Sequence, residues 1–312
     1  MHTKTVRGII YALLAGTCWG FSGTVGQYLF TEKGVDPGWL TTVRLLVSGL
    51  ILLIWAAVRK REQMKTIWMS KETAGRLLFF AVFGLMSVQY SYMASISCSN
   101  AGTATAIQYL GEALILLVTC VSMRRLPKIT ESFGLILALA GVFLLATHGN
   151  TNSMVLSGKG LFWGLISAVA LMLYTLLPAK LIAEYGSQVV TGYGMTVGGV
   201  VLAILLRPWH RTLEADWQVF LGMAVIILVG TVLAFTVFLQ STVDIGGVKA
   251  GLLASTETIA APFFAALWLH TKFETADFAG FVCMLVMVVL LALPDLGITV
   301  REKSADQQQN AA

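Results

Sequence analysis

The chain has 312 residues, of which 57% are hydrophobic and 12% are charged. Soluble domains carry about 25% charged residues, so this composition excludes a soluble globular protein of the same length. The formal net charge of +5 does not indicate a nucleic-acid partner, because the Lys and Arg residues flank apolar segments and form no single basic face. The composition predicts a polytopic membrane protein.

Apolar segments of about the length needed to cross a bilayer follow one another along the whole chain. They cover residues 7–30, 38–58, 75–97, 101–123, 129–147, 158–183, 188–206, 217–240, 247–270 and 276–297. This pattern predicts an all-α membrane protein with ten transmembrane helices. The turns at 97–100 and 244–247 are short, so nine or eleven spans are alternatives at this stage.

The basic residues predict the orientation of these spans. Loops on one side, together with both termini, carry about three times as many Lys and Arg residues as the loops on the other side, which places both termini in the cytoplasm. The first apolar segment continues past residue 25 without an A-x-A cleavage site, so it is expected to be a retained helix. Residues 301–312 are expected to form a disordered polar cytoplasmic tail.

The two halves of the chain repeat each other. Residues 8–34 align without gaps on 160–186, and 101–123 align on 246–268. Because each half contributes an odd number of spans, the second copy must insert upside down relative to the first. We expect two inverted five-helix repeats, residues 1–148 and 149–300.

Two acidic residues lie near the middle of apolar segments, Glu112 in the fourth and Glu257 in the ninth, at equivalent positions of the repeat. An acidic side chain at that depth costs about 2.5–3.5 kcal/mol on insertion scales, so each should face the bundle interior. Two interpretations are open for this pair. They are neutral, hydrogen-bonded structural glutamates, or they bind substrate or exchange a proton.

Polar and aromatic residues in neighbouring spans extend this candidate site. The candidate substrate-binding residues are Trp19, Ser22, Gln89, Tyr92, Gln108, Glu112, Tyr174 and Glu257. Aromatic and amide side chains around a midplane carboxyl indicate a pocket for a small organic molecule. The same residues would also serve as hydrogen-bonding contacts between helices, which is the alternative.

Two further residues are candidates for movement or gating. Arg44 lies well inside the second span, where it either snorkels to a headgroup or acts as a gate, an anion contact or an ion pair. Pro262 removes a backbone hydrogen bond five residues after Glu257, which predicts a kink that serves as a hinge or for packing. Pro178 predicts another bend near the inner end of the sixth span.

Several glycines recur at i, i+4 spacing, which permits close contact between helices. The pairs are Gly16 and Gly20, Gly160 and Gly164, and Gly247 and Gly251.

Motifs of other protein classes are missing from the sequence. It has no Walker A loop and no HExxH, which excludes ATP-driven pumping and zinc hydrolysis. The four cysteines are scattered singly and are expected to be small apolar fillers. We therefore expect no cofactor, no metal site and no enzymatic activity.

Three stretches resemble a known family. Trp19-Gly20 in the first span, Arg44 followed by Leu45-Leu-Val-Ser-Gly-Leu, and Ala254-Ser-Thr-Glu257 resemble EamA-type members of the drug/metabolite transporter superfamily. The resemblance covers nearly the whole chain. It implies a bacterial inner-membrane carrier, commonly an exporter of amino acids or other metabolites, with helices five and ten outside a central cavity. In the fourth span Gly111-Glu112-Ala113 departs from the family, since many relatives have a proline beside the equivalent position.

The sequence therefore predicts a secondary transporter that moves a small metabolite by alternating access. Proton coupling is an open possibility, with Glu257 and Glu112 binding the substrate amine or the proton. The expected partners are a small-molecule substrate, the lipid bilayer and protons, with the protein a monomer or homodimer. The alternative is an intramembrane enzyme or a structural membrane scaffold.

Overall fold

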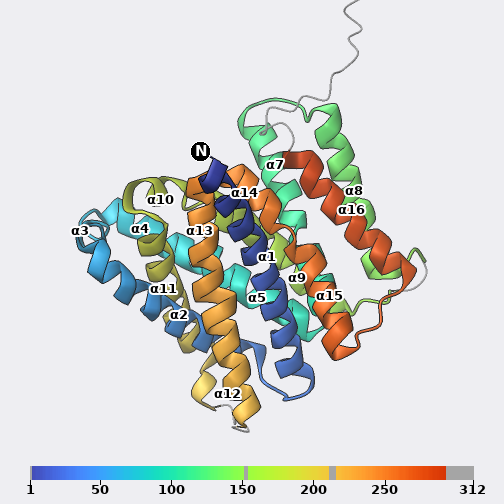
Figure 1. Ribbon diagram of the computed structural model, residues 1–312, viewed down its shortest axis with the longest axis horizontal. Helices are drawn as coiled ribbons and strands as arrows, with labels where there is room; N and C mark the ends of the chain where they lie inside the picture. The colour runs from blue at the N-terminus through green and yellow to red at the C-terminus, as the bar shows by residue number, and fades with distance from the viewer. Residues whose placement is uncertain (1, 151–153, 211–215, 293–312) are drawn as a thin grey trace, which may run out of the picture.

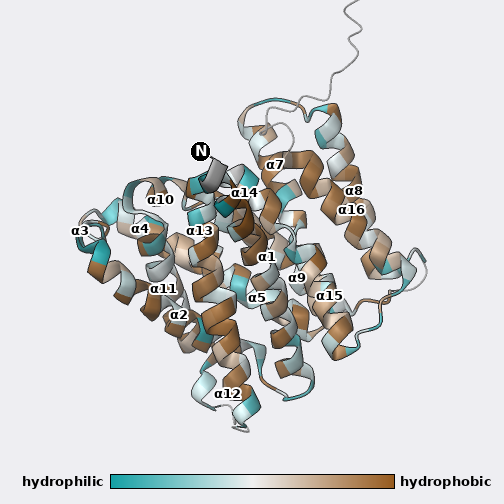
Figure 2. Cartoon of the chain, viewed as in Figure 1, coloured by the Kyte–Doolittle hydropathy of each residue, from teal (hydrophilic) through white to brown (hydrophobic). Residues whose placement is uncertain are grey.

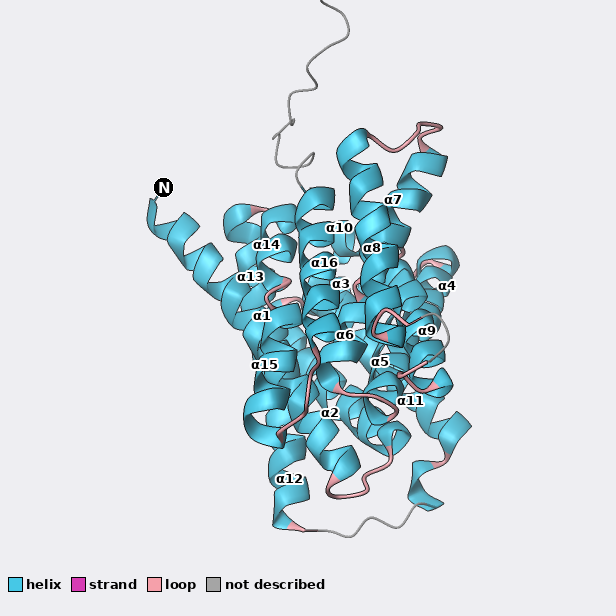
Figure 3. Cartoon of the chain, turned by 90° about the vertical axis from the view of Figure 1, so that its right-hand side faces the viewer, coloured by secondary structure: helices cyan, strands magenta, loops and turns pink. Residues whose placement is uncertain are grey.

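The computed structural model of the chain describes residues 2–150, 154–210 and 216–292. Within these ranges the chain consists of helices joined by short loops (Figure 3). Ten of the helices in the described chain are long and apolar enough to cross a membrane. The predictions of an all-α fold and ten spans are confirmed. The expected polar tail, residues 301–312, lies outside the described residues.

The first repeat contains five spans, of which the third and fourth are each built from more than one element. Its elements are α1 (His2–Thr31), α2 (Pro37–Arg59), α3 (Arg61–Thr66), α4 (Lys71–Phe79), the π-helix η1 (Phe80–Met86), α5 (Ser87–Ser97), α6 (Ala101–Gln108), α7 (Leu110–Ser122) and α8 (Ile129–Thr147).

The second repeat has the same order of spans, again with composite third and fourth spans. Its elements are α9 (Gly158–Leu176), α10 (Ala179–Tyr185), α11 (Ser187–Leu206), the 3₁₀-helix η2 (Pro208–His210), α12 (Trp217–Ala224), the π-helix η3 (Val225–Leu233), α13 (Ala234–Ile245), α14 (Gly247–Ala254), α15 (Glu257–Leu269) and α16 (Thr275–Ala292).

Short polar residues define where several spans begin. The carboxylate of Asp36 accepts the Trp39 backbone N–H at the start of α2, and Pro37 occupies the first turn, where a missing N–H has no cost. Asn100 caps α6 in the same way by accepting the Thr103 N–H at 2.8 Å.

The long helices are formed largely by hydrophobic residues (Figure 2), and many large apolar side chains are exposed on the outside of the bundle. Ile54 is 67% exposed, Leu139 69% and Leu205 66%, whereas such residues are normally buried in a water-soluble protein. In a bilayer these side chains face lipid, so their exposure carries no penalty. Polar residues gather instead at the ends of the spans, as on α3 (Figure 2).

The packing between helices follows the repeat. The first span of each repeat packs on the third and fourth spans of the other: α1 lies against α13 and α15, and α9 lies against α5 and α7. The second spans, α2 and α11, pack on each other. The two repeats are therefore interleaved, and a polar group on a third or fourth span faces residues of the opposite repeat.

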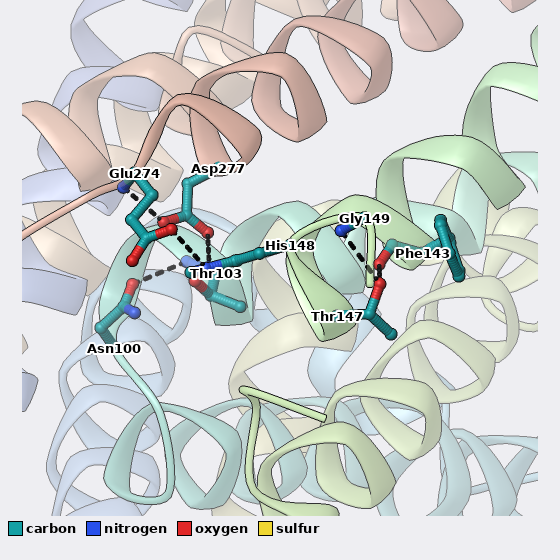
Figure 4. Close-up of polar contacts among 8 residues, drawn as sticks. All are labelled: Asn100, Thr103, Phe143, Thr147, His148, Gly149, Glu274 and Asp277. Atoms are coloured by element: carbon teal, nitrogen blue, oxygen red, sulfur yellow. Dashed lines mark hydrogen bonds and ion pairs between the residues drawn. The ribbon is translucent and has the colours of Figure 1, made fainter. Parts of the chain in front are cut away.

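The fifth spans, α8 and α16, pack mainly on each other at one edge of the bundle (Figure 1). His148, at the end of α8, joins them through contacts of 3.0 Å from Nδ1 to Glu274 and 3.0 Å from Nε2 to Asp277 (Figure 4). The other carboxylate oxygen of Asp277 accepts the Glu274 backbone N–H at the start of α16. This peripheral pair matches the arrangement that the resemblance implied for helices five and ten.

Ion pairs tie α1 to the composite third span of the second repeat at both of its ends. Arg7 makes two bonds to Asp244, at 2.7 and 2.8 Å, near the start of α1. Beyond its other end Lys33 lies 2.6 Å from Asp216, which also caps α12. The Lys33 ammonium lowers the pKa of the Asp216 carboxyl, and the hydrogen bond to Asp216 raises the pKa of Lys33.

Close helix contacts confirm the interpretation of some glycine pairs and correct another. A Cβ on Gly20 would lie 2.7 Å from the Ala261 backbone nitrogen, and one on Gly164 would lie 2.8 Å from Ile107. Among the described residues, apart from the neighbouring backbone of the same helix, no atom lies within 4 Å of the position that a Cβ would take on Gly247 or Gly251. The packing role expected of this third pair is wrong, because α14 presents these glycines to open space.

Pro178 ends a helix where the sequence predicted a bend. The sixth span was expected to run over 158–183, but α9 ends at Leu176 and Pro178 precedes the short helix α10. A proline at this position cannot donate the hydrogen bond that would continue α9, so the chain starts a new helix there.

Candidate functional site

Two spans are interrupted in the middle, at nearly equivalent positions of the repeat. α6 and α7 are separated by Tyr109, and α14 and α15 by Ser255 and Thr256. At each interruption a backbone N–H bonds to the carbonyl three residues earlier, Glu112 to Tyr109 at 3.0 Å and Thr258 to Ser255 at 2.9 Å. These tight turns divide each span into two half-helices. In the first repeat the break at Tyr109 forms although the fourth span contains no proline.

Glu257 is the first residue of α15, so its carboxyl lies at the N-terminal end of a half-helix. Helix N-termini carry a partial positive charge, which favours an acidic side chain there. Discontinuous membrane helices of this kind recur at the substrate and ion sites of secondary transporters. The break thus places a titratable group at a position suited to binding.

Two tyrosines from the first repeat hold the Glu257 carboxyl. Tyr92 of α5 donates to Oε1 at 3.3 Å, and Tyr109 donates to Oε2 at 3.4 Å. The Tyr92 hydroxyl also lies 2.7 Å from the Thr105 hydroxyl. Glu257 is only 7% exposed, and a carboxyl shielded from solvent needs such donors within the protein. This set of four side chains joins both repeats.

Arg44 lies inside the bundle rather than at its surface. The side chain is 4% exposed, and its Nε donates to the Thr231 hydroxyl at 2.9 Å. It makes no ion pair with a carboxylate in the described chain. In this conformation the Arg44 side chain is therefore buried against Thr231, and it reaches neither the bundle surface nor a carboxylate of the described residues.

Each third span contains a π-helix that starts at the equivalent position of its repeat. η1 begins at Phe80 and η3 at Val225, related by the same alignment that places Ala101 on Gly246. Next to η1 Ser87 donates to the carbonyl of Val82, and within η3 Thr231 donates to that of Ile226; both carbonyls lie five residues earlier. π-Helical turns concentrate at functional sites, and here the turn orients the hydroxyl that binds Arg44.

Other candidate residues contact different parts of the bundle. Gln108 donates to the Ser167 hydroxyl of α9 at 2.7 Å, and Gln89 is buried on α5. Trp19 packs against aromatic rings of α13, and Tyr174 stacks on Phe80 with 6.0 Å between the ring centroids. The ring contacts of Trp19 and Tyr174 are thus with other hydrophobic side chains and not with the Glu257 carboxyl.

The two glutamates differ in their surroundings although they are related by the repeat. Glu112 is partly exposed, and no side-chain hydrogen bond holds it among the described residues. Glu257, in contrast, is buried and bonded to two tyrosines. The two half-sites are not chemically equivalent.

Pro262 lies within α15 and is packed on both sides. A Cβ on Gly102 of α6 would lie 2.8 Å from the proline ring, so only glycine lets α6 approach this closely. On the other side Thr24 of α1 donates to the Ala261 carbonyl at 3.3 Å. The segment around Pro262 is therefore held between two helices of the first repeat.

Two residues of this site, Tyr109 and Thr231, were not identified from the sequence. Tyr109 is adjacent to the polar residue Gln108 and three residues before Glu112, which is a weak signal of a shared face. Thr231 is the only hydroxyl residue in the otherwise apolar stretch 219–235, and that isolation is the signal that could have revealed it.

Comparisons with known proteins match one family model over most of the chain. The family model for "EamA-like transporter family" matches residues 6–147 and 158–293. The inner membrane transporter YicL of Salmonella typhimurium is 33% identical over 290 residues, which covers 93% of this chain and 96% of that protein. A transporter of Synechocystis is 22% identical over 289 residues, covering 85% of this chain and 86% of the relative. A solved crystal structure superimposes with a TM-score of 0.62 at 12% identity, over 96% of this chain and 99% of the other.

Proposed function

This chain belongs to the EamA-like transporter family, and from that premise we propose that it moves a small metabolite across a bacterial inner membrane by alternating access. The proposed direction is export, with both termini in the cytoplasm. The alternatives of an intramembrane enzyme and of a structural scaffold do not fit a family of transporters.

The observation that supports a specific mechanism is the Glu257 carboxyl at the break between α14 and α15. It belongs to the second repeat, whereas its two hydrogen-bond donors, Tyr92 and Tyr109, belong to the first. Rocking of one repeat against the other would lengthen or break these bonds, since a hydrogen bond weakens steeply with distance and angle. The carboxyl would then become available to a proton or to the amine of a substrate.

In the proposed cycle Glu257 alternates between two sets of partners. With the tyrosines bound the carboxyl is shielded, and with the repeats displaced it exchanges a proton or a cationic group with one side of the membrane. A carboxyl at the interface between the two repeats couples the exchange of a proton or cationic group to the movement of the repeats. Its occupancy changes the relative free energies of the two conformations. Glu112, which lacks such donors in the described structure, plays a lesser part.

Flux through reconstituted vesicles tests this function. A screen for metabolites that an overexpressing strain tolerates identifies a compound, and proteoliposomes then measure its movement under an imposed pH gradient. We expect Glu257→Gln to abolish gradient-driven flux, because glutamine keeps the size and hydrogen bonding of the side chain but cannot titrate. Glu62→Gln, at an exposed glutamate of α3, is the matched control and should transport normally.

Normal gradient-driven flux by Glu257→Gln would contradict the coupling mechanism. An absence of flux for every tolerated compound with the unaltered protein would contradict transport itself.

A further inference from the structure

The two interrupted spans are related by the repeat, but they pack differently. α6 of the first repeat corresponds to α14 of the second, and α7 corresponds to α15. α6 packs on α15 and on α1. The repeat relates these contacts to contacts of α14 with α7 and α9, yet in the described chain the main partners of α14 are α1, α13 and α16. A packing between repeats that is formed by α6 is therefore missing from the surroundings of α14.

Gly102 of α6 lies at the packed end of the bundle. A Cβ on Gly102 would lie 2.8 Å from the Cβ of Pro262 and 3.0 Å from its Cα, so the backbone of α6 lies directly against α15. Gln27 of α1 joins the same region, since its side chain accepts the Ala101 N–H at 2.8 Å and donates to the Thr271 hydroxyl at 3.0 Å. We call this the closed end of the bundle.

Gly247 of α14 occupies the position equivalent to Gly102. The fourth and ninth spans run in opposite directions, so Gly247 lies toward the opposite end of the bundle. Among the described residues outside its own helix, no atom lies within 4 Å of the place that a Cβ would take on Gly247. Leu117 of α7 is the equivalent of Pro262, and it is 42% exposed whereas Pro262 is buried. Figure 3 shows α14 and α7 on different sides of this end, which we call the open end.

The unequal ends indicate what a second conformation would look like. Two repeats with the same fold can exchange their arrangements, because each arrangement is already adopted by one copy. In such an exchange α14 takes the arrangement of α6, and Gly247 approaches Leu117 as Gly102 now approaches Pro262. A glycine permits this approach, since it lets two helix backbones come close together.

We propose that Gly247 of α14 and Leu117 of α7 form the contact that closes the open end in the alternate conformation, while Gly102 separates from Pro262. This inference rests on the proposed alternating access. In the proposed topology the open end faces the cytoplasm, so the conformation described here is the one in which an exporter would load its substrate.

Gly251, one turn further along α14, provides a matched control. It also faces open space, but its equivalent in α6 is Ala106, which is fully buried. An alanine is thus already accommodated at this position of the packed arrangement. At the position of Gly102 a Cβ is not accommodated, because Pro262 lies too close.

Flux in proteoliposomes tests the closing contact. Gly247→Ala should lower flux by about tenfold, because its Cβ hinders the approach of α14 to α7. Gly251→Ala should transport normally. Neither variant should lower the unfolding temperature, since both positions have free space in the conformation described here. Equal flux in the two variants would overturn the proposal.

Thiol labelling follows the two conformations without a substrate. Gly251→Cys places a thiol at the open end of the full-length protein, and a maleimide labels it in detergent. The mass of the labelled peptide separates this thiol from the four native cysteines. Adding Gly102→Ala crowds Pro262 at the closed end and so favours the alternate conformation, in which α14 packs on α7. We expect labelling to become about fivefold slower.

The direction of this change separates a conformational shift from loss of stability. A variant that only destabilises the fold exposes the thiol and speeds labelling, so slower labelling identifies the exchange between conformations. Adding Gly247→Ala in place of Gly102→Ala should not slow labelling. The proposal is overturned if Gly102→Ala leaves the rate unchanged or raises it.

Failure of this inference can be distinguished from failure of the proposed function. Normal flux by Gly247→Ala would remove the closing contact and leave transport standing. Slower labelling with Gly102→Ala, in a protein that moves no tolerated compound, would leave the closing contact and remove transport.

Discussion

Tyr92 of α5 donates a 3.3 Å hydrogen bond to the Glu257 carboxyl of α15, between residues 165 positions apart in the sequence and in different repeats. Tyr109 makes a similar bond of 3.4 Å to the other carboxylate oxygen. These bonds connect the two bodies that the proposed mechanism moves. They should therefore influence transport more than stability.

The first prediction concerns these tyrosines. Tyr92→Phe should reduce flux more than Tyr109→Phe, because Tyr92 also contacts Thr105. Each bond is long, so a loss of about 0.5–1.5 kcal/mol, or a change of about two- to tenfold, is expected. Combining Tyr92→Phe with Glu257→Gln should add nothing further. Tyr193→Phe, which removes a bond to the Met64 carbonyl on another part of the bundle, is the control.

The second prediction concerns the proline inside α15. Pro262→Ala should slow turnover while substrate affinity stays within a few fold, because the change alters the barrier between conformations and not the contacts of the site. Flux rates and binding measured on the same preparation separate the two effects. A collapse of affinity with normal turnover would show that the proline shapes the pocket.

The third prediction concerns close packing of α1 on α15. Gly20→Ala should destabilise the protein by about 1–3 kcal/mol, because its Cβ would meet the α15 backbone at 2.7 Å. Gly251→Ala should be neutral or stabilising by up to about 1 kcal/mol, since it faces open space and alanine favours the helix. Thermal unfolding in detergent measures both. Equal effects at the two sites would contradict the packing described for α1.

The fourth prediction concerns the Lys33–Asp216 ion pair and pH. The lowered pKa of Asp216 means that its contribution is present above about pH 3.8 and is lost only as pH falls through the lowered value. The raised pKa of Lys33 means that its contribution is present below about pH 10.5 and is lost as pH rises through the raised value.

The destabilisation caused by Asp216→Asn should therefore be constant between pH 5 and 9, and it should decrease with added salt, since both side chains are partly exposed. Unfolding temperatures across this range provide the measurement. A destabilisation that disappears within the range would mean that the pair is not ionised as described.

The fifth prediction concerns orientation in the membrane. Reporters active only in the cytoplasm should work when fused after Lys65, Lys128 and Lys303, and should fail after Asn152 and Lys272. Asn152 and Lys303 lie outside the described residues, but their sides follow from the order of the spans. Cytoplasmic activity at Asn152 would contradict the proposed topology.

The number of spans and the repeat were predictable from the chain because a bilayer imposes a simple requirement. Every backbone polar group in lipid must bond within its own helix, so long apolar segments mark the spans directly. The same penalty makes an acidic residue in such a segment conspicuous, which is how Glu257 and Glu112 were identified.

The partners of these residues depended on packing between distant segments. Thr105 and Gln108 lie on one short helix, yet the first contacts Tyr92 and the second bonds to Ser167 of α9. The free side of Gly251 and the burial of Arg44 against Thr231 likewise follow from which helices are neighbours. Hydropathy is a property of each segment alone, whereas a hydrogen bond or a close approach needs two surfaces, and only the folded bundle determines which surfaces meet.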